Sequence, residues 1–151
     1  MNQSVMFPSE QWFRELARQM QTEKYKDQYR GLGAIDCTMV VQVDDPQGPD
    51  LIEVQFKSYE VRSIRQLNSL DEADPEHFRI EGPYEAWQEM IENIMENGEP
   101  DLEHTLNFLT FPDDPMVVDG PDQLQTDTFY RYNQSLQLFF NGAAEVATRF
   151  A

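Results

Sequence analysis

Residues 77–98 read HFRIEGPYEAWQEMIENIMENG, and this stretch decides the fold class. At its start Phe78 and Ile80 alternate with polar residues, which predicts a short strand. Gly82-Pro83 ends the strand, and proline suits the first turn of a helix. The following apolar residues recur at helical spacing opposite a row of glutamates, and Asn97-Gly98 supplies a C-cap. The predicted helix carries on its inner side Tyr84, Trp87, Met90, Ile91, Ile94 and Met95.

A helix is also expected near the start of the chain. Pro8-Ser9-Glu10 marks its beginning, with Ser9 as the N-cap, and an apolar stripe continues to Met20. The polar stretch from Gln21 to Arg30 extends this helix until Gly31-Leu32-Gly33 ends it.

Three segments after this helix alternate as β-strands, at residues 34–43, 51–59 and 60–67. The acidic, proline-containing run 44–49 is predicted to be the loop between the first two. Three strands joined by short loops predict an antiparallel meander. Its alternation requires one buried and one wet face, with Glu53 on the wet face.

The remainder of the chain is mainly helical in pattern. Pro100–Leu109 predicts a second, shorter helix, and residues 116–118 predict a short strand after a proline-rich turn. Apolar residues from Phe129 to Phe150 predict the last helix, which Gly142 breaks or kinks. No repeat and no linker is evident, so residues 1–151 are expected to form a single α+β domain with its core over about 7–150.

The 151-residue chain has 28 acidic residues against 11 Lys and Arg, a formal net charge of −17. Residues 68–127 hold 17 of the acidic residues and Arg79 as their only Lys or Arg. This charge argues against nucleic-acid binding and against docking on anionic membranes. The simplest interpretation is a solvated coat that keeps the protein in solution. A surface that steers a basic partner, or adaptation to high salt, is the alternative.

The sequence has no second cysteine, no long apolar run and no signal core, and these features indicate the compartment and the redox chemistry. Cys37 is the only cysteine, which excludes an internal disulfide and a multi-cysteine metal site, and a thiol on an apolar strand face normally only packs. No run approaches the roughly 18 apolar residues of a spanning helix. The opening MNQSVMFPSEQWF is neither basic nor an apolar signal core. We expect a cytoplasmic protein without stable membrane insertion.

Catalytic candidates are few. His77 and His104 each adjoin a glutamate, but neighbouring side chains point apart, so neither pair is a dyad by sequence. No nucleotide-binding, zinc-protease or nucleophile-elbow motif occurs. The carboxylates around Glu92, Glu96 and Asp101 lie on a solvated face and would hold a hard cation only weakly. We expect no enzyme activity, no cofactor and no metal. A small hydrolase or isomerase using either histidine is the catalytic alternative.

The last third of the chain is richer in Phe, Tyr and Met than a small sheet needs for its cover. Such stripes form either a solid core or the lining of an apolar cavity. The pattern by itself leaves both interpretations open.

The segment His77–Trp87, HFRIEGPYEAW, resembles the strand-to-helix junction of the sterol carrier protein 2 (SCP2) sterol-transfer domain family. The elements after it are similar in order: a short helix at Pro100–Leu109, a brief strand ending in glycine at Met116–Gly120, and a last helix at Phe129–Phe150. With the N-terminal helix and the meander, the resemblance covers roughly residues 7–150. It rests on element order and one moderately specific segment.

The resemblance implies an SCP2-like sheet of about five strands, mostly antiparallel and covered by helices, with an apolar tunnel and no catalysis. Family members that transfer lipids are often basic, whereas this chain is acidic, which favours binding of a smaller or different apolar molecule over shuttling of sterols between membranes. The alternative is an acidic interaction or oligomerisation module without a ligand, acting as a homodimer or with a protein partner. By position, the tunnel residues would be Trp87, Met90, Ile91, Ile94, Leu106, Leu109, Phe129, Leu136, Phe139 and Phe140.

Overall fold

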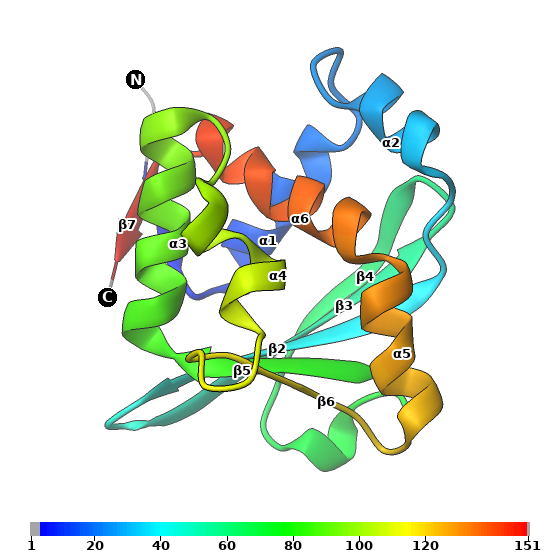
Figure 1. Ribbon diagram of the computed structural model, residues 1–151, viewed down its shortest axis with the longest axis vertical. Coiled ribbons are helices and arrows are strands. Elements are labelled where there is room, and N and C mark those ends of the chain that lie inside the picture. The colour runs from blue at the N-terminus through cyan, green and yellow to red at the C-terminus, as the bar shows by residue number, and fades with distance from the viewer. Residues whose placement is uncertain (1–3, 151) are drawn as a thin grey trace.

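A five-stranded sheet with helices on one face organises the molecule (Figure 1), and the computed structural model describes residues 4–150 of the chain. The strands lie in the order β4-β3-β2-β5-β6. Within this sheet β2 and β5 pair in parallel, and the other neighbours are antiparallel. The predicted α+β class with a mostly antiparallel sheet is therefore confirmed. The strand bounds are β2 Cys37–Asp45, β3 Gly48–Lys57, β4 Glu60–Leu67, β5 Phe78–Pro83 and β6 Val117–Asp119.

The meander formed by β2, β3 and β4 is confirmed, but its first loop is shorter than expected. The ladder between β2 and β3 continues to the pair Asp45 and Gly48, so only Pro46 and Gln47 remain as the turn. The Asp45 carboxylate accepts a hydrogen bond from the Gln47 N–H at 2.8 Å. Acidic and proline residues favour loops locally, but here pairing between the two strands extends the hairpin ladder through them.

Helix α1 (Glu10–Gln19) begins as predicted, with the Ser9 hydroxyl accepting from the Trp12 N–H at 3.0 Å. The expected extension is wrong, because a turn separates it from a second helix, α2 (Lys26–Leu32). The turn lets Tyr25 and Tyr29 become buried, and the Tyr25 hydroxyl donates to the Asn141 carbonyl at 3.2 Å. Burial of two tyrosines outweighs the continuity of a polar helix.

Helix α3 (Tyr84–Asn97) is confirmed, with Gly98 as its C-cap, but Met95, which was predicted on its inner side, is 37% exposed. The predicted helix over Pro100–Leu109 is instead two short pieces, the 3-10 turn η2 (Leu102–His104) and the one-turn helix α4 (Leu106–Leu109). Asp101 and Thr105 each cap the piece that follows, accepting from backbone N–H groups at 3.1 Å. Two caps within five residues start two turns rather than one helix.

The C-terminal prediction of one helix to Phe150 is wrong at its end. The chain forms α5 (Gln123–Arg131), α6 (Asn133–Asn141) and the 3-10 turn η3 (Gly142–Glu145). Strand β7 (Thr148–Phe150) then pairs in parallel with β1 (Val5–Phe7). Gly142 breaks the helix as expected, and a Cβ there would lie 3.3 Å from the Gln19 Cβ, so glycine allows α1 to approach. Strands β1 and β7 have three residues each, which is too few to show the alternation from which a strand is predicted.

The face of the sheet away from the helices is buried in part, whereas the sequence predicted a wet face. The segment between β4 and β5, which contains the 3-10 turn η1 (Leu70–Glu72), covers part of it, and a small apolar cluster forms there. Glu53 is 0% exposed beneath this cover. Its carboxylate accepts from Arg65 at 2.7 Å and from the Asp74 N–H at 2.8 Å. A buried carboxylate satisfied in this way belongs to the interior despite its charge.

Candidate functional site

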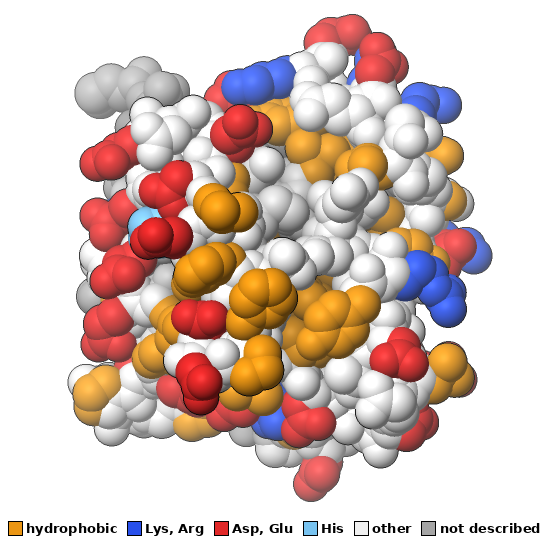
Figure 2. All heavy atoms as spheres, in the orientation of Figure 1, with side chains coloured by type: hydrophobic (Ala, Val, Ile, Leu, Met, Phe, Trp, Pro, Cys, Tyr) orange, Lys and Arg blue, Asp and Glu red, His pale blue; other side chains and the backbone are white. Residues whose placement is uncertain are grey.

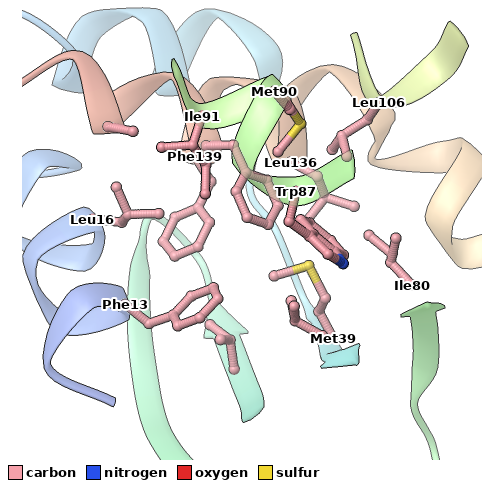
Figure 3. Packing of buried hydrophobic residues seen from close by; sticks show 14 of the residues in the cluster. Phe13, Leu16, Met39, Ile80, Trp87, Met90, Ile91, Leu106, Leu136 and Phe139 are labelled. Atoms are coloured by element: carbon pink, nitrogen blue, oxygen red, sulfur yellow. The ribbon is translucent and has the colours of Figure 1, made fainter. Parts of the chain in front are cut away.

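The ten predicted tunnel residues come together on the helix-covered face of the sheet. Four lie on α3, two on α4, one on α5 and three on α6, and all ten belong to one buried cluster. Nine are 0% exposed and Leu109 is 7% exposed. Figure 3 shows Trp87, Met90, Leu106, Leu136 and Phe139 directed toward a common region above Met39 of β2. The sequence therefore located a contiguous interior, while the role of these residues in binding stays a prediction.

Aromatic rings connect this interior from one side to the other. Phe139 lies 5.6 Å from Phe140, and Phe140 lies 5.7 Å from Trp87, measured between ring centroids. Phe139 also meets Phe56 of β3 edge to face at 5.1 Å. The Trp87 indole N–H donates to the Gln42 carbonyl at 3.2 Å, so its polar atom is satisfied inside an otherwise apolar region. Such a region offers dispersion contacts and few hydrogen bonds to a ligand.

The junction between β5 and α3 fits closely because residue 82 is glycine. A Cβ on Gly82 would lie 2.9 Å from the Met116 Cγ and 3.4 Å from the Trp87 Nε1. Met116 is 1% exposed. The glycine in HFRIEGPYEAW therefore allows the chain before β6 to pack against the start of α3.

Within residues 4–150, none of the four clefts described is lined by any of the ten residues, all of which belong to the buried cluster. Two of these clefts reach the buried cluster: one through Ile64 of β4, and the other, of about 350 Å³, through Phe56 of β3. The latter lies at the ends of β2 and β3 beside α5, and Cys37 and Phe56 connect it to the buried cluster. We call it the β2–α5 cleft; its lining is completed by Asp36, Thr38, Gln55, Arg62, Asp74, Glu76, Leu124, Gln125, Thr128 and Arg131.

Sequence reasoning missed the β2–α5 cleft. Its residues come from β2 and the preceding Asp36, from β3, β4 and α5, and from the segment before β5, and no spacing along the chain relates them. The cleft mixes the cations Arg62 and Arg131 with the carboxylates of Asp36, Asp74 and Glu76. Burial, and to a lesser extent the nearby Asp36 charge, raises the pKa of the Cys37 thiol to about 12. The thiol is thus protonated at neutral pH and a weak nucleophile.

Both histidines are held by local hydrogen bonds. His77 is 7% exposed, and its Nδ1 lies 2.6 Å from the Asp74 carbonyl oxygen. The Nδ1 of His104 lies 2.6 Å from Asp101 Oδ1, and this contact is the largest cause of the lowered pKa of the Asp101 carboxyl. Asp101 also caps η2, which gives the pair a structural role.

No three His, Cys, Asp or Glu side chains within residues 4–150 gather closely enough to hold a metal ion. Over the same part of the chain, no helix combines the length and the apolar character needed to cross a membrane.

Helices on one face of this sheet define an α+β fold that has a counterpart among solved structures. The chain is similar to the solution structure of the conserved hypothetical protein TT1886 from Thermus thermophilus, described as a possible sterol carrier protein. The TM-score is 0.64 at 21% identity, over 98% of this chain and 95% of the other. At this identity the likeness concerns the fold. No family model matches the chain, and no curated protein matches it.

Proposed function

We propose that the protein binds a hydrophobic small molecule or lipid between its helices and its sheet, without catalysing a reaction. The observation that carries the proposal is the convergence of ten apolar side chains from α3, α4, α5 and α6 on one region. The likeness to a possible sterol carrier protein supports the same class of ligand. Affinity would come mainly from apolar area removed from water, about 25 cal/mol per Å².

The β2–α5 cleft is the proposed route of access. Phe56 lines the cleft, and its ring lies 5.1 Å from that of Phe139 inside the cluster. A ligand that displaces Phe56 and Phe139 would therefore pass from the cleft into the interior. Because the ten side chains are buried against one another, we propose that loading moves α5 and α6 away from the sheet. Met39 and Met90, which are flexible, would readjust around the ligand.

The direct test is native mass spectrometry of the purified protein, with lipid extraction and titration by a fluorescent fatty acid and a fluorescent sterol. We expect one saturable site for at least one probe and a matching mass increase. Absence of co-purified lipid together with no saturable binding of either probe would overturn the proposal.

The route is tested by Thr128→Trp, which places a large side chain in the β2–α5 cleft without entering the core. We expect probe affinity to fall about tenfold, equal to about 1.4 kcal/mol, with unchanged thermal stability. The matched control is Gln123→Trp, on the same helix but exposed and outside the cleft lining. Equal affinities for the two variants would place the access route elsewhere.

The cytoplasm is the compartment proposed with this function, since the acidic surface repels anionic membranes and favours free diffusion. A second candidate function, protein interaction, is favoured by one observation. Exposed apolar side chains gather in the most acidic part of the chain.

A further inference from the structure

An exposed apolar surface covers the short elements between α3 and α5. Leu102 is 77% exposed, Phe111 50% and Val117 52%. The ring of Phe108 lies 6.2 Å from that of Phe111. We call these four residues the 102–117 surface. Figure 2 shows hydrophobic side chains gathered over α4 and the turn that follows it, with Asp and Glu side chains among and around them. Single exposed apolar residues need no explanation, but a group of this kind marks an interaction site.

The backbone under the 102–117 surface is held in place. The Leu106 N–H donates to Gln137 Oε1 of α6 at 2.7 Å, and the Met116 N–H donates to the Leu109 carbonyl at 3.0 Å. Leu106, Leu109 and Met116 are buried beneath it. A partner would therefore have to order the exposed side chains on binding, but not the backbone beneath them.

The stretch of chain that carries this surface is acidic. Residues 80–130 contain 13 Asp and Glu and no Lys or Arg. In the described part of the chain, ion pairs reach only three of those carboxylates, at Glu81, Asp101 and Asp119. The negative charge of the remaining carboxylates is not neutralised by ion pairs, so their electrostatic potential attracts cations and repels anions.

The apolar surface and the acidic charge together restrict which kind of partner can bind here. An anionic membrane is repelled. A second copy has the same acidic surface, and six of the eight Lys and Arg in residues 1–67 already form ion pairs within the chain: Arg14, Arg18, Lys24, Lys26, Lys57 and Arg65. A partner with apolar side chains flanked by lysine or arginine satisfies both the contact and the charge.

We propose that the 102–117 surface is a docking site for a basic amphipathic segment of another protein. Leu102, Phe111 and Val117 provide the apolar contact, and the surrounding carboxylates accelerate association and determine its salt dependence. The proposal is independent of ligand binding in the interior, because none of these side chains lines the β2–α5 cleft.

The test uses a synthetic helical peptide of leucine and lysine, about 18 residues long, with leucine on one face. Titration into the ¹⁵N-labelled protein should shift amide resonances of residues 101–119, with affinity that falls as salt is raised. The double variant Leu102→Ser, Phe111→Ser should weaken binding about tenfold. The control Leu32→Ser, Tyr130→Ser removes an exposed leucine and an exposed aromatic side chain, both outside the 102–117 surface and outside the β2–α5 cleft lining, and should change the affinity less than about twofold.

Several results would overturn the proposal: no binding of the peptide, amide shifts outside residues 101–119, or equal weakening in both double variants. Binding to phosphatidylglycerol vesicles but not to the peptide would assign the surface to a membrane. A dimer that the Leu102→Ser, Phe111→Ser variant dissociates would assign it to a second copy. The same variants are also titrated with the fatty acid probe. Because their interior is unchanged, they should bind the probe like the wild type, so loss of peptide binding can be distinguished from loss of ligand binding.

Discussion

Helices cover the inner face of the sheet and a short segment covers part of the outer face, and the two covers are held by different physical means. The inner face meets helices through an apolar cluster that extends from α1 to α6. The outer face meets the segment 68–77 through one buried carboxylate, Glu53, and a few apolar contacts. Apolar contacts are non-directional and can be rearranged, whereas a buried carboxylate requires donors at fixed positions. The inner face is therefore held by packing that can rearrange, as the proposed ligand binding would require, and the outer face by directional hydrogen bonds.

The largest effect is expected on the inner face. Phe139→Ala removes a fully buried ring that contacts Phe13, Phe56 and Phe140, and should lower the free energy of unfolding by about 4 kcal/mol. Urea denaturation measures it. Phe111→Ala removes the same side chain from an exposed position and should change stability by less than about 0.5 kcal/mol. Similar losses in both would contradict the burial described above.

A larger side chain in the buried cluster distinguishes a solid core from a tunnel. Leu136 is 0% exposed, so Leu136→Trp should overpack the interior and lower the free energy of unfolding by about 3 kcal/mol. Thermal denaturation without ligand measures the change. A variant that stays stable but loses the fatty acid probe would instead show that the interior opens as a tunnel.

On the outer face, Glu53→Gln removes the charge that Arg65 and the Asp74 N–H stabilise. Burial alone would raise the pKa of the Glu53 carboxyl, but these hydrogen bonds and the Arg65 charge hold the pKa below its usual value. Since Arg65 is half exposed, we expect a loss of about 2 kcal/mol at pH 7.

The pH dependence of that difference has a defined sign. Because the carboxyl pKa is lower in the folded protein, its contribution is present above the unfolded value of about 4.3 and disappears as the pH falls through the folded pKa. Urea denaturation between pH 7 and pH 3 should therefore show wild type and Glu53→Gln converging in acid. The exposed Glu60→Gln should show no such convergence, and a constant difference for Glu53→Gln would contradict the assignment.

The smallest effect is expected where the sheet meets α3. Gly82→Ala adds a Cβ at 2.9 Å from the Met116 Cγ, which should cost about 1 kcal/mol because Met116 has little room to move. Gly31→Ala is the matched control in α2, where nothing lies within 4 Å, and alanine should stabilise the helix by up to about 1 kcal/mol. Calorimetric melting temperatures should move in opposite directions.

The local sequence pattern predicted the strongly periodic elements correctly. It was wrong mainly where contacts with residues far away in the sequence determine the structure. The inner stripe of α3 and the Ser9 cap followed from neighbours in sequence. The turn before α2 depended on tyrosines that find their contacts across the fold, whereas the break between η2 and α4 came from the local caps Asp101 and Thr105. Strand β7 depended on pairing with β1, at the other end of the chain.

The sequence by itself determined the α+β class, the residues of the apolar interior and the concentration of acidic charge in residues 68–127, because periodicity and composition are local properties. Only the tertiary structure decided that Glu53 is buried, that the β2–α5 cleft borders the interior, and that Leu102, Phe111 and Val117 remain exposed. Each of these depends on which segments fold over which face, and that is settled by contacts between residues far apart in the chain.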